Sequence, residues 1–367
     1  MKYVLFIAAL CVCLSATAQS DLILADTLWI HKVNPDNIDQ DLESFFPILR
    51  SSKIPIVADN MNKVLQMENL GFVLNGENEA SLLQPVKIST GDGNFSFSIQ
   101  RVNDQLIIVN VSRFRRINQM SLNGYDETRK FLFDAYSGQP ILMKDFFAPE
   151  AWNKLRDVLK AGFRKDFMRS LGESYKAGFN EKDLPAFNQE CDCNCLDYID
   201  KSFCTGNIDV DVDTSARTMS FSIPDCDWMN PRRHDAYKTT MTFDQISPML
   251  SAYGSTVIMK PHAAPEASLT GLWKGSLGGR LPITFILIPD ACNPSVGRGL
   301  EIYDHYGICI PISFVNESGT ISLTELDAHG KTQATVTATY HNGMLAGMWY
   351  KAHSTVEHTF SATHAGR

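Results

Sequence analysis

Hydrophobic residues follow two different spacings in the stretch from Phe131 to Met168. Residues 131–133 and 141–143 are short apolar runs on either side of Ser137-Gly138, and glycine suits a turn because it readily adopts positive φ angles. After Pro149 large apolar residues recur every three or four positions, as on a helix with one apolar face. They are Trp152, Leu155, Leu159, Phe163 and Phe167. The stretch predicts a strand, a turn, a second strand and a long helix that packs on a sheet.

Shorter patterns on either side supply that sheet. Phe95, Phe97 and Ile99 alternate with serines, which is typical of a half-buried strand, and residues 106–111 form a second run after a turn. Further strands are expected at residues 27–33, 208–213, 218–223 and 238–243, and short helical segments at 41–46, 58–67 and 243–250. We interpret residues 19–260 as an α+β module in which a helix packs on an antiparallel sheet.

The residue pattern changes after a proline- and alanine-rich segment, residues 261–267, whose composition is typical of a linker. Glycine-punctuated strands then follow one another without a helical stripe. They are expected at residues 272–275, 283–288, 299–303, 308–314, 320–325, 334–340, 344–350 and 357–361. Regular short strands of this kind predict a second, all-β domain over residues 268–367, a small antiparallel barrel.

The first 18 residues have the features of a secretory signal peptide. A basic start at Lys2 precedes an apolar run, and small residues end at Ala18, where we expect cleavage. No later segment reaches the roughly 20 apolar residues of a membrane helix. The net charge of −8 does not fit a nucleic-acid-binding surface. We therefore expect a secreted or periplasmic protein with no membrane span and no nucleic-acid partner.

Cysteine is concentrated in two parts of the remaining chain. An exported protein favours disulfides, and because the chain after residue 18 has seven cysteines, an odd number, at least one thiol is unpaired or forms an intermolecular bond. The candidates are Cys191, Cys193, Cys195, Cys204, Cys226, Cys292 and Cys309. The last two could bridge neighbouring barrel strands. The C-x-C spacing at 191–195 is less typical of structural zinc than of disulfides, so no metal is expected there.

Other chemical patterns are incomplete. Asp209, Asp211 and Asp213 resemble the start of a calcium loop, but Thr214 stands where that loop needs glycine. Cys226 and His234 could form a thiol–imidazole pair, although a disulfide-bonded Cys226 and a surface histidine explain them as well. No nucleotide-binding or hydrolase motif is present. We expect no cofactor, and an enzyme is the less favoured class.

Four segments resemble a known family. The segments IPIVADNMNKVL, FSFSIQRVNDQLIIVNV, FLFDAYSGQPILMKDFF and MTFDQISPML share the layout of the extracellular module of the lysozyme-sensing anti-sigma factor RsiV and of some peptidoglycan deacetylases. Asp134, Ser137-Gly138, Asp145 and Phe146 hold the places of its recurring turn and helix entry. The sigma-binding segment and the deacetylase domain have no counterpart, and residues 225–234 depart from the family pattern. Gly271-Leu272-Trp273 resembles the first strand of lipocalin-type barrels.

This resemblance implies a non-enzymatic binding protein with lysozyme or a cell-wall glycan as its partner. Trp228 and Tyr237 are candidate contacts because sugar faces stack on aromatic rings, and Arg232, Arg233 and His234 could bind an anionic group. One alternative is a cell-wall hydrolase with Asp225, Asp227 and His234 as acid–base groups. Another alternative is a small-molecule carrier, which requires an open, apolar barrel lumen.

Overall fold

The computed structural model describes residues 23–32, 42–73, 95–116, 124–174, 180–186, 195–205, 208–223, 237–259 and 269–365. The predicted signal peptide, the linker and the candidate contacts Trp228, Arg232, Arg233 and His234 lie outside these ranges. Within them, none of the helices combines the length and the apolar character needed to cross a membrane.

A two-stranded hairpin and a helix open the described chain. Strands β1 (Leu24–Lys32) and β2 (Leu42–Arg50) pair antiparallel, with Trp29 opposite Phe45. The prediction of a short helix at 41–46 is wrong: residues 42–46 pair with β1, and their aromatic residues suit a strand. Helix α2 (Pro55–Leu70) begins with proline in its first turn and ends at Gly71, whose φ of 74° is left-handed.

The predicted hairpin belongs to a four-stranded antiparallel sheet. Its order is β3 (Phe95–Arg101), β4 (Leu106–Arg116), β5 (Gly124–Asp134) and β6 (Pro140–Ile141). A 3₁₀ turn, η3 (Met143–Phe146), leads from β6 to the long helix α3 (Pro149–Ser174). All five apolar residues of the predicted helical stripe are buried.

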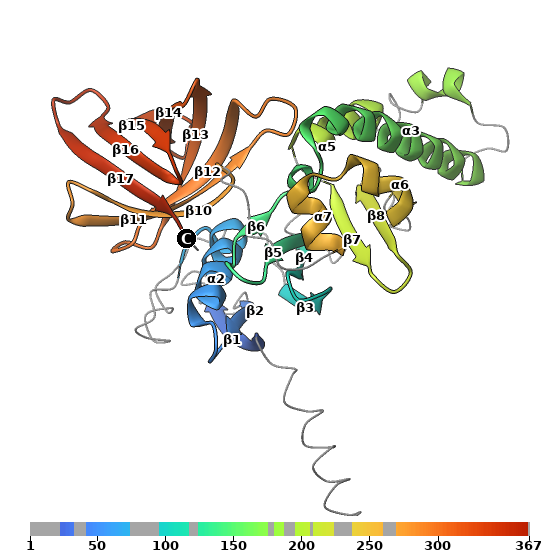
Figure 1. Cartoon of the computed structure of the whole chain (residues 1–367), viewed down its shortest axis with the longest axis horizontal. Helices are drawn as coiled ribbons and strands as arrows, with labels where there is room; N and C mark the ends of the chain where they lie inside the picture. Colours follow the sequence, from blue (N-terminus) through green and yellow to red (C-terminus); the bar gives the residue numbers. More distant parts are fainter. Residues whose placement is uncertain are drawn as a thin grey trace, which may run out of the picture.

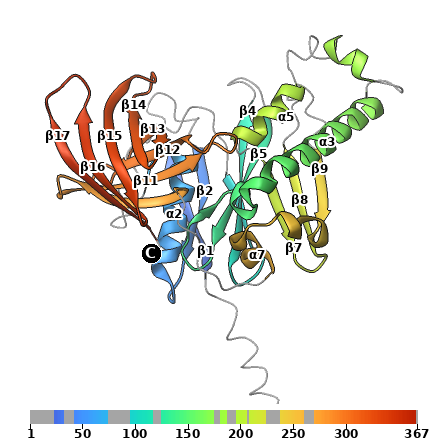
Figure 2. The ribbon, with the colours of Figure 1, turned by 45° about the horizontal axis from the view of Figure 1, so that its top comes forward.

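Helix α3 packs on a second sheet, formed by β7 (Asp209–Asp213), β8 (Thr218–Ile223) and β9 (Tyr237–Thr242) (Figure 2). Helix α5 (Cys195–Thr205), which the sequence did not predict, lies against α3 with Phe203 5.8 Å from Phe163. Around the end of β9 lie α6 (Phe243–Ile246), η5 (Ser247–Met249) and α7 (Ala252–Met259), while η4 (Glu181–Asp183) follows α3. Their apolar faces share one core.

The C-terminal part is a closed antiparallel barrel of eight strands (Figure 1), as predicted. Each strand pairs with the next in sequence, and the last closes on the first. The strands are β10 (Gly271–Leu277), β11 (Leu281–Pro289), β12 (Val296–Tyr303), β13 (Cys309–Glu317), β14 (Thr320–Leu326), β15 (Thr332–His341), β16 (Met344–Lys351) and β17 (Glu357–His364). An α+β arrangement followed by an all-β barrel is therefore confirmed.

The outer wall of the barrel packs on α2, which lies beside it in Figure 1. Leu272, Ile286 and Ile302 point out of the barrel into a core shared with α2 and β4. The turn between β5 and β6 fixes this junction through Gln139, whose side chain accepts a hydrogen bond from the Leu272 N–H (2.7 Å) and donates one to its carbonyl (3.3 Å). The side chain thus bonds to β10 as a neighbouring strand would.

Candidate functional site

A cavity of about 280 Å³ lies where the α+β part meets the outer wall of the barrel. On one side are residues of α2, β5, β6, η3 and the start of β7. On the other side are residues of β11 and β12. The ends of α3 and α5 complete the wall through Trp152 and Phe203. Cavities between two packed units are common places for ligand sites.

Much of the cavity wall is apolar and aromatic. Phe131, Trp152 and Phe203 bring aromatic side chains, and the barrel contributes Ile286 and Ile288. Trp152 has a polar group to offer as well: its side chain is buried, with 8% of the residue exposed, and its Nε1–H has no hydrogen-bond partner. An unpaired buried donor costs free energy, so a ligand acceptor would be favoured there.

Charged side chains at the cavity are mostly cationic, although the whole chain is acidic. Four cationic residues line it, against the two carboxyl groups of Glu68 and Asp209. The cations are Arg129, Lys130, Lys144 and Arg298. Glu68 lies 3.8 Å from both Arg129 and Arg298, so it connects β5 to the barrel wall. The cavity therefore favours an anionic group on a ligand.

Burial changes the acid–base behaviour of two of these groups. Burial raises the pKa of Asp209 to about 6, and the charge of Lys130 opposes the shift. Lys130 itself pairs with Asp211, two residues further along β7, at 2.5 Å. Burial also lowers the pKa of Lys144, opposed by the charges of Asp145 and Asp290. Acidification below about pH 6 would thus make the cavity more positive.

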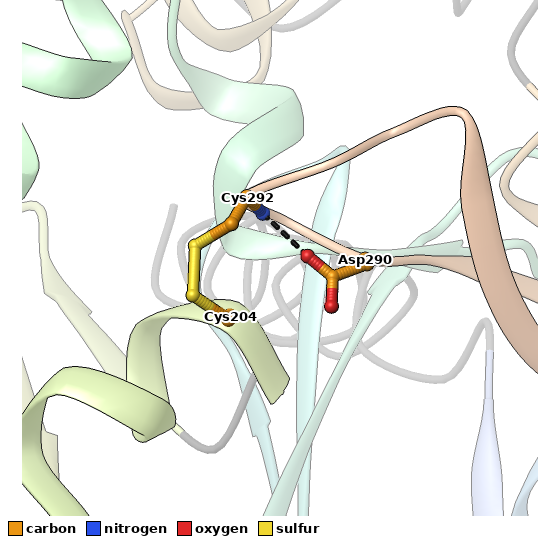
Figure 3. Close-up of side chains that lie close together, drawn as sticks. All are labelled: Cys204, Asp290 and Cys292. Carbon is orange, nitrogen blue, oxygen red and sulfur yellow. Dashed lines mark hydrogen bonds between the residues drawn. A yellow bond between two sulfur atoms is a disulfide. The ribbon is translucent and has the colours of Figure 1, made fainter. Parts of the chain in front are cut away.

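A disulfide joins the two parts of the chain at the edge of the cavity (Figure 3). Cys204, in α5, bonds to Cys292, in the turn after β11. Their neighbours Phe203 and Ala291 both line the cavity. The Asp290 carboxylate accepts a hydrogen bond from the Cys292 N–H at 2.7 Å and so holds the turn. The bond therefore fixes one wall of the cavity against the other.

The predicted Cys292–Cys309 bridge is wrong, because Cys292 is bonded to Cys204 and Cys309 is a free thiol. Cys309 is the first residue of β13, at the opposite end of the barrel from the turn that carries Cys292. Cys195 opens α5, while Cys191, Cys193 and Cys226 lie outside the described residues. One group in the described chain has the spacing of metal ligands, namely Cys204, Asp290 and Cys292. Its two sulfur atoms are bonded to each other in the disulfide and are therefore not available as thiolate ligands.

Tyr237 is the one candidate contact that the structure describes. It opens β9 and is 4% exposed, and its ring packs edge-to-face on the Phe167 ring with the two ring centroids 5.5 Å apart. Core packing accounts for this ring, and a ligand contact by it stays a prediction. The carboxylates of β7 do not all face solvent: Asp209 and Asp211 are half-buried toward Lys130, and Asp213 is exposed.

Aromatic side chains fill the barrel lumen. Trp273 stacks on Phe285 at 6.1 Å, and Phe285 contacts Phe360 at 6.0 Å; all three are fully buried. The tryptophan of the Gly-x-Trp segment is thus a core residue. An interior packed in this way gives no support to the carrier hypothesis, which needs an open lumen.

The sequence matches no protein family model and no curated protein. Two crystal structures of DUF3298 family proteins show a partial likeness. The one from Pseudomonas aeruginosa PAO1 is 9% identical, with 63% of this chain and 96% of that chain covered and a TM-score of 0.40. The one from Bacteroides fragilis is 11% identical, with 65% and 97% covered and a TM-score of 0.39. Likenesses with TM-scores below 0.5 support no conclusion about function.

Proposed function

We propose that this chain is an exported, non-enzymatic binding protein and that the cavity between the α+β part and the barrel is its ligand site. The observation that carries the proposal is the cavity itself. Its wall combines aromatic rings, a surplus of cationic side chains and a buried indole N–H without a partner. Each of these features is more favourable with a ligand in place than without one.

The ligand class that best fits this chemistry is a small glycan fragment that carries a carboxylate, such as a piece of cell-wall peptidoglycan. Sugar faces stack on aromatic rings, and the guanidinium of Arg298 can pair with a carboxylate. The resemblance to the RsiV module points to the same group of ligands. A whole lysozyme molecule is far larger than the cavity, so lysozyme stays a prediction of that resemblance alone.

Hydrolysis of such a glycan has less support. The residues first considered for it, Asp225, Asp227 and His234, lie outside the described chain. Of the two carboxyl groups at the cavity, Glu68 is already engaged with two arginines, Arg129 and Arg298, in contacts that join β5 to the barrel wall. A pair of free carboxyl groups flanking a glycosidic bond would be needed for the reaction.

Calorimetry with a muramyl disaccharide-peptide and with the neutral, fully N-acetylated chitobiose tests the proposal. We expect saturable binding of the acidic fragment and weaker binding of the neutral one. Arg298→Ala removes a cavity cation that is 57% exposed in its side chain and should weaken binding about tenfold, or about 1.4 kcal/mol. Arg280→Ala is the matched control, because Arg280 lies in the exposed turn after β10 and does not line the cavity.

A second variant isolates the indole. Trp152→Phe keeps an aromatic ring and breaks no hydrogen bond within the protein, so the free energy of unfolding should fall only by the packing lost with the smaller ring, about 1 kcal/mol, while binding weakens. Binding that is equal in wild type, Arg298→Ala and Trp152→Phe would place the ligand elsewhere. Heat with lysozyme and none with either glycan would overturn the glycan proposal.

A further inference from the structure

Two glutamates lie inside the barrel, on the opposite face of its wall from the cavity. Glu301 of β12 and Glu325 of β14 occupy inward-facing positions and are 1% and 4% exposed. Strand β13 separates them: Glu301 lies opposite Ile310 and Glu325 opposite Ile312. Buried carboxyl groups are costly, and small barrels normally fill such positions with apolar side chains.

The two carboxyl groups have unequal surroundings. Glu325 Oε1 accepts hydrogen bonds from the Tyr303 hydroxyl at 2.9 Å and from the Trp349 indole at 2.5 Å. Both carboxylate oxygens of Glu301 are buried without a hydrogen-bond partner. Burial raises the pKa of Glu325 as well, but these two donors oppose the shift there, whereas no hydrogen bond opposes it at Glu301.

We propose that Glu301 and Glu325 hold one proton between them, carried by Glu301, and that this proton makes the closure of this end of the barrel sensitive to pH. A protonated Glu301 becomes a donor, and the ionised Glu325 offers it an acceptor. The pair then carries a single negative charge. When the proton leaves to solvent, two negative charges face each other in the barrel interior.

The neighbouring groups support this assignment. Tyr303 on β12 is the titratable group beside the two glutamates. The exposed His358 on β17 stacks on the Trp349 indole with 5.5 Å between ring centroids, so the indole lies between this histidine and the glutamates. Phe285 on β11 and Ala334 on β15 pair with the two glutamates and carry no charge. No Lys, Arg or His of the described chain forms an ion pair with either carboxyl group. Burial and then the charge of Glu325 raise the pKa of Glu301 well above its usual range.

The sign of the pH dependence follows from this. Glu301 has a higher pKa in the folded barrel than its usual 4.5, so the folded state binds the proton more tightly than the unfolded state. The stability gained by holding the proton is complete at acid pH. It is lost as the pH rises from about 4.5 through the pKa of the folded protein.

Opening of the barrel at the end that holds Glu301 would also disturb its contacts with the α+β part. The turn between β12 and β13 follows Tyr303 directly, and there the Val73 N–H donates to the Gly307 carbonyl at 2.9 Å while Phe72 forms a bridge with Ile308. Phe72 and Val73 follow α2. The proton on Glu301 thus favours the contact between the barrel and the end of α2, and alkaline pH weakens that contact.

Urea unfolding of the full chain from pH 4.5 to pH 9 tests the proposal, with Glu301→Gln as a neutral isostere. We expect the wild-type midpoint to fall as the pH rises and the variant profile to be flatter. At pH 8 the folding equilibrium constant of Glu301→Gln should be about tenfold larger than that of the wild type. Glu317→Gln is the control: Glu317 is an exposed residue at the end of β13, and its profile should follow the wild type.

Infrared spectroscopy gives a readout that does not depend on the variant's stability. The folded wild type at pH 7 should show the carbonyl stretch of a buried carboxylic acid, and Glu301→Gln should lack this band. Parallel pH profiles for wild type and Glu301→Gln, or no such band in the wild type, would overturn the proposal. Stabilisation of the wild type alone by Ca²⁺, with Glu301→Gln weakened at every pH, would show a metal ion in place of the proton.

Discussion

The barrel and the α+β part solve the problem of burying a sheet in opposite ways. The barrel closes eight strands on themselves, fills the interior with its own side chains and leaves no strand edge unpaired. In its described residues the α+β part has open sheets of two, four and three strands, which are covered by helices and by the barrel wall. The cavity available to a ligand therefore lies where the open sheets of the α+β part meet the closed wall of the barrel.

Removal of an interior aromatic ring tests whether the barrel is only a packed scaffold. Phe285→Ala deletes a fully buried ring between Trp273 and Phe360 and should lower the free energy of unfolding by about 3–5 kcal/mol in chemical denaturation. Val315→Ala, at an exposed position of β13, should cost less than about 0.5 kcal/mol. Loss of ligand binding in a Phe285→Ala protein of unchanged stability would instead place the site in the lumen.

Removal of the disulfide tests how strongly the two parts are held together. The double variant Cys204→Ala/Cys292→Ala opens a link between residues 88 positions apart and should lower the free energy of unfolding by about 2–4 kcal/mol. Binding at the cavity should weaken with it, because α5 and the barrel turn are then free to separate. Cys309→Ala changes a free thiol and serves as the control. Equal stability of the double variant and wild type would show that packing alone fixes the junction.

The turn between β5 and β6 offers a sharper test of the junction. A Cβ added to Gly138, at a φ of +70°, would lie 2.4 Å from the Val57 carbonyl oxygen of α2. Gly71 has a similar φ of +74°, but nothing lies within 4 Å of its added Cβ. Gly138→Ala should therefore cost about 2 kcal/mol more than Gly71→Ala in thermal unfolding. Similar costs would mean that α2 moves to make room.

The smallest expected effect concerns the carboxyl groups of β7. Burial gives Asp209 a folded pKa of about 6, against a usual 3.8, so this residue reduces stability progressively as the pH rises from about 4 to about 6. A rise of the pKa from 3.8 to about 6 corresponds to roughly 3 kcal/mol, and solvent screening of this half-buried group reduces it, so Asp209→Asn should remove that loss and stabilise the protein at pH 7 by about 1 kcal/mol. The pKa of Asp213 is lowered by hydrogen bonds from Ser215 and Ala216, so Asp213→Asn should act in the opposite direction. Stability profiles with pH would show both signs; equal signs would contradict the burial of Asp209.

Local sequence patterns predicted most of the helices and strands. The strand alternation and the glycine turns predicted all eight barrel strands, and the apolar stripe predicted α3. Residues 42–50 were harder, since their strand exists through its pairing with β1. Helix α5 was missed although Leu196, Ile199 and Phe203 have helical spacing, because the surrounding cysteines and turn residues indicated a disulfide-rich loop.

The candidate site could not be read from the sequence. Glu68 and Arg298 meet across 230 residues of chain, and neither belongs to a motif. Trp152 looks like any core tryptophan on a helix, and only the structure shows that its indole N–H has no partner. The one feature with a local signal was the cysteine content, and even there the pairing depended on how the barrel docks.

The 88-residue distance between Cys204 and Cys292 also has a consequence in time. A ribosome that adds about 5–20 residues per second needs on the order of 4–18 s to reach the second cysteine after the first. During that interval the possible partners of Cys204 are the earlier cysteines, among them Cys191 and Cys193, and Cys226, which is added 22 residues after it. Early wrong pairs then have to be exchanged once the barrel forms, so we expect thiol–disulfide exchange to set the pace at which this protein matures.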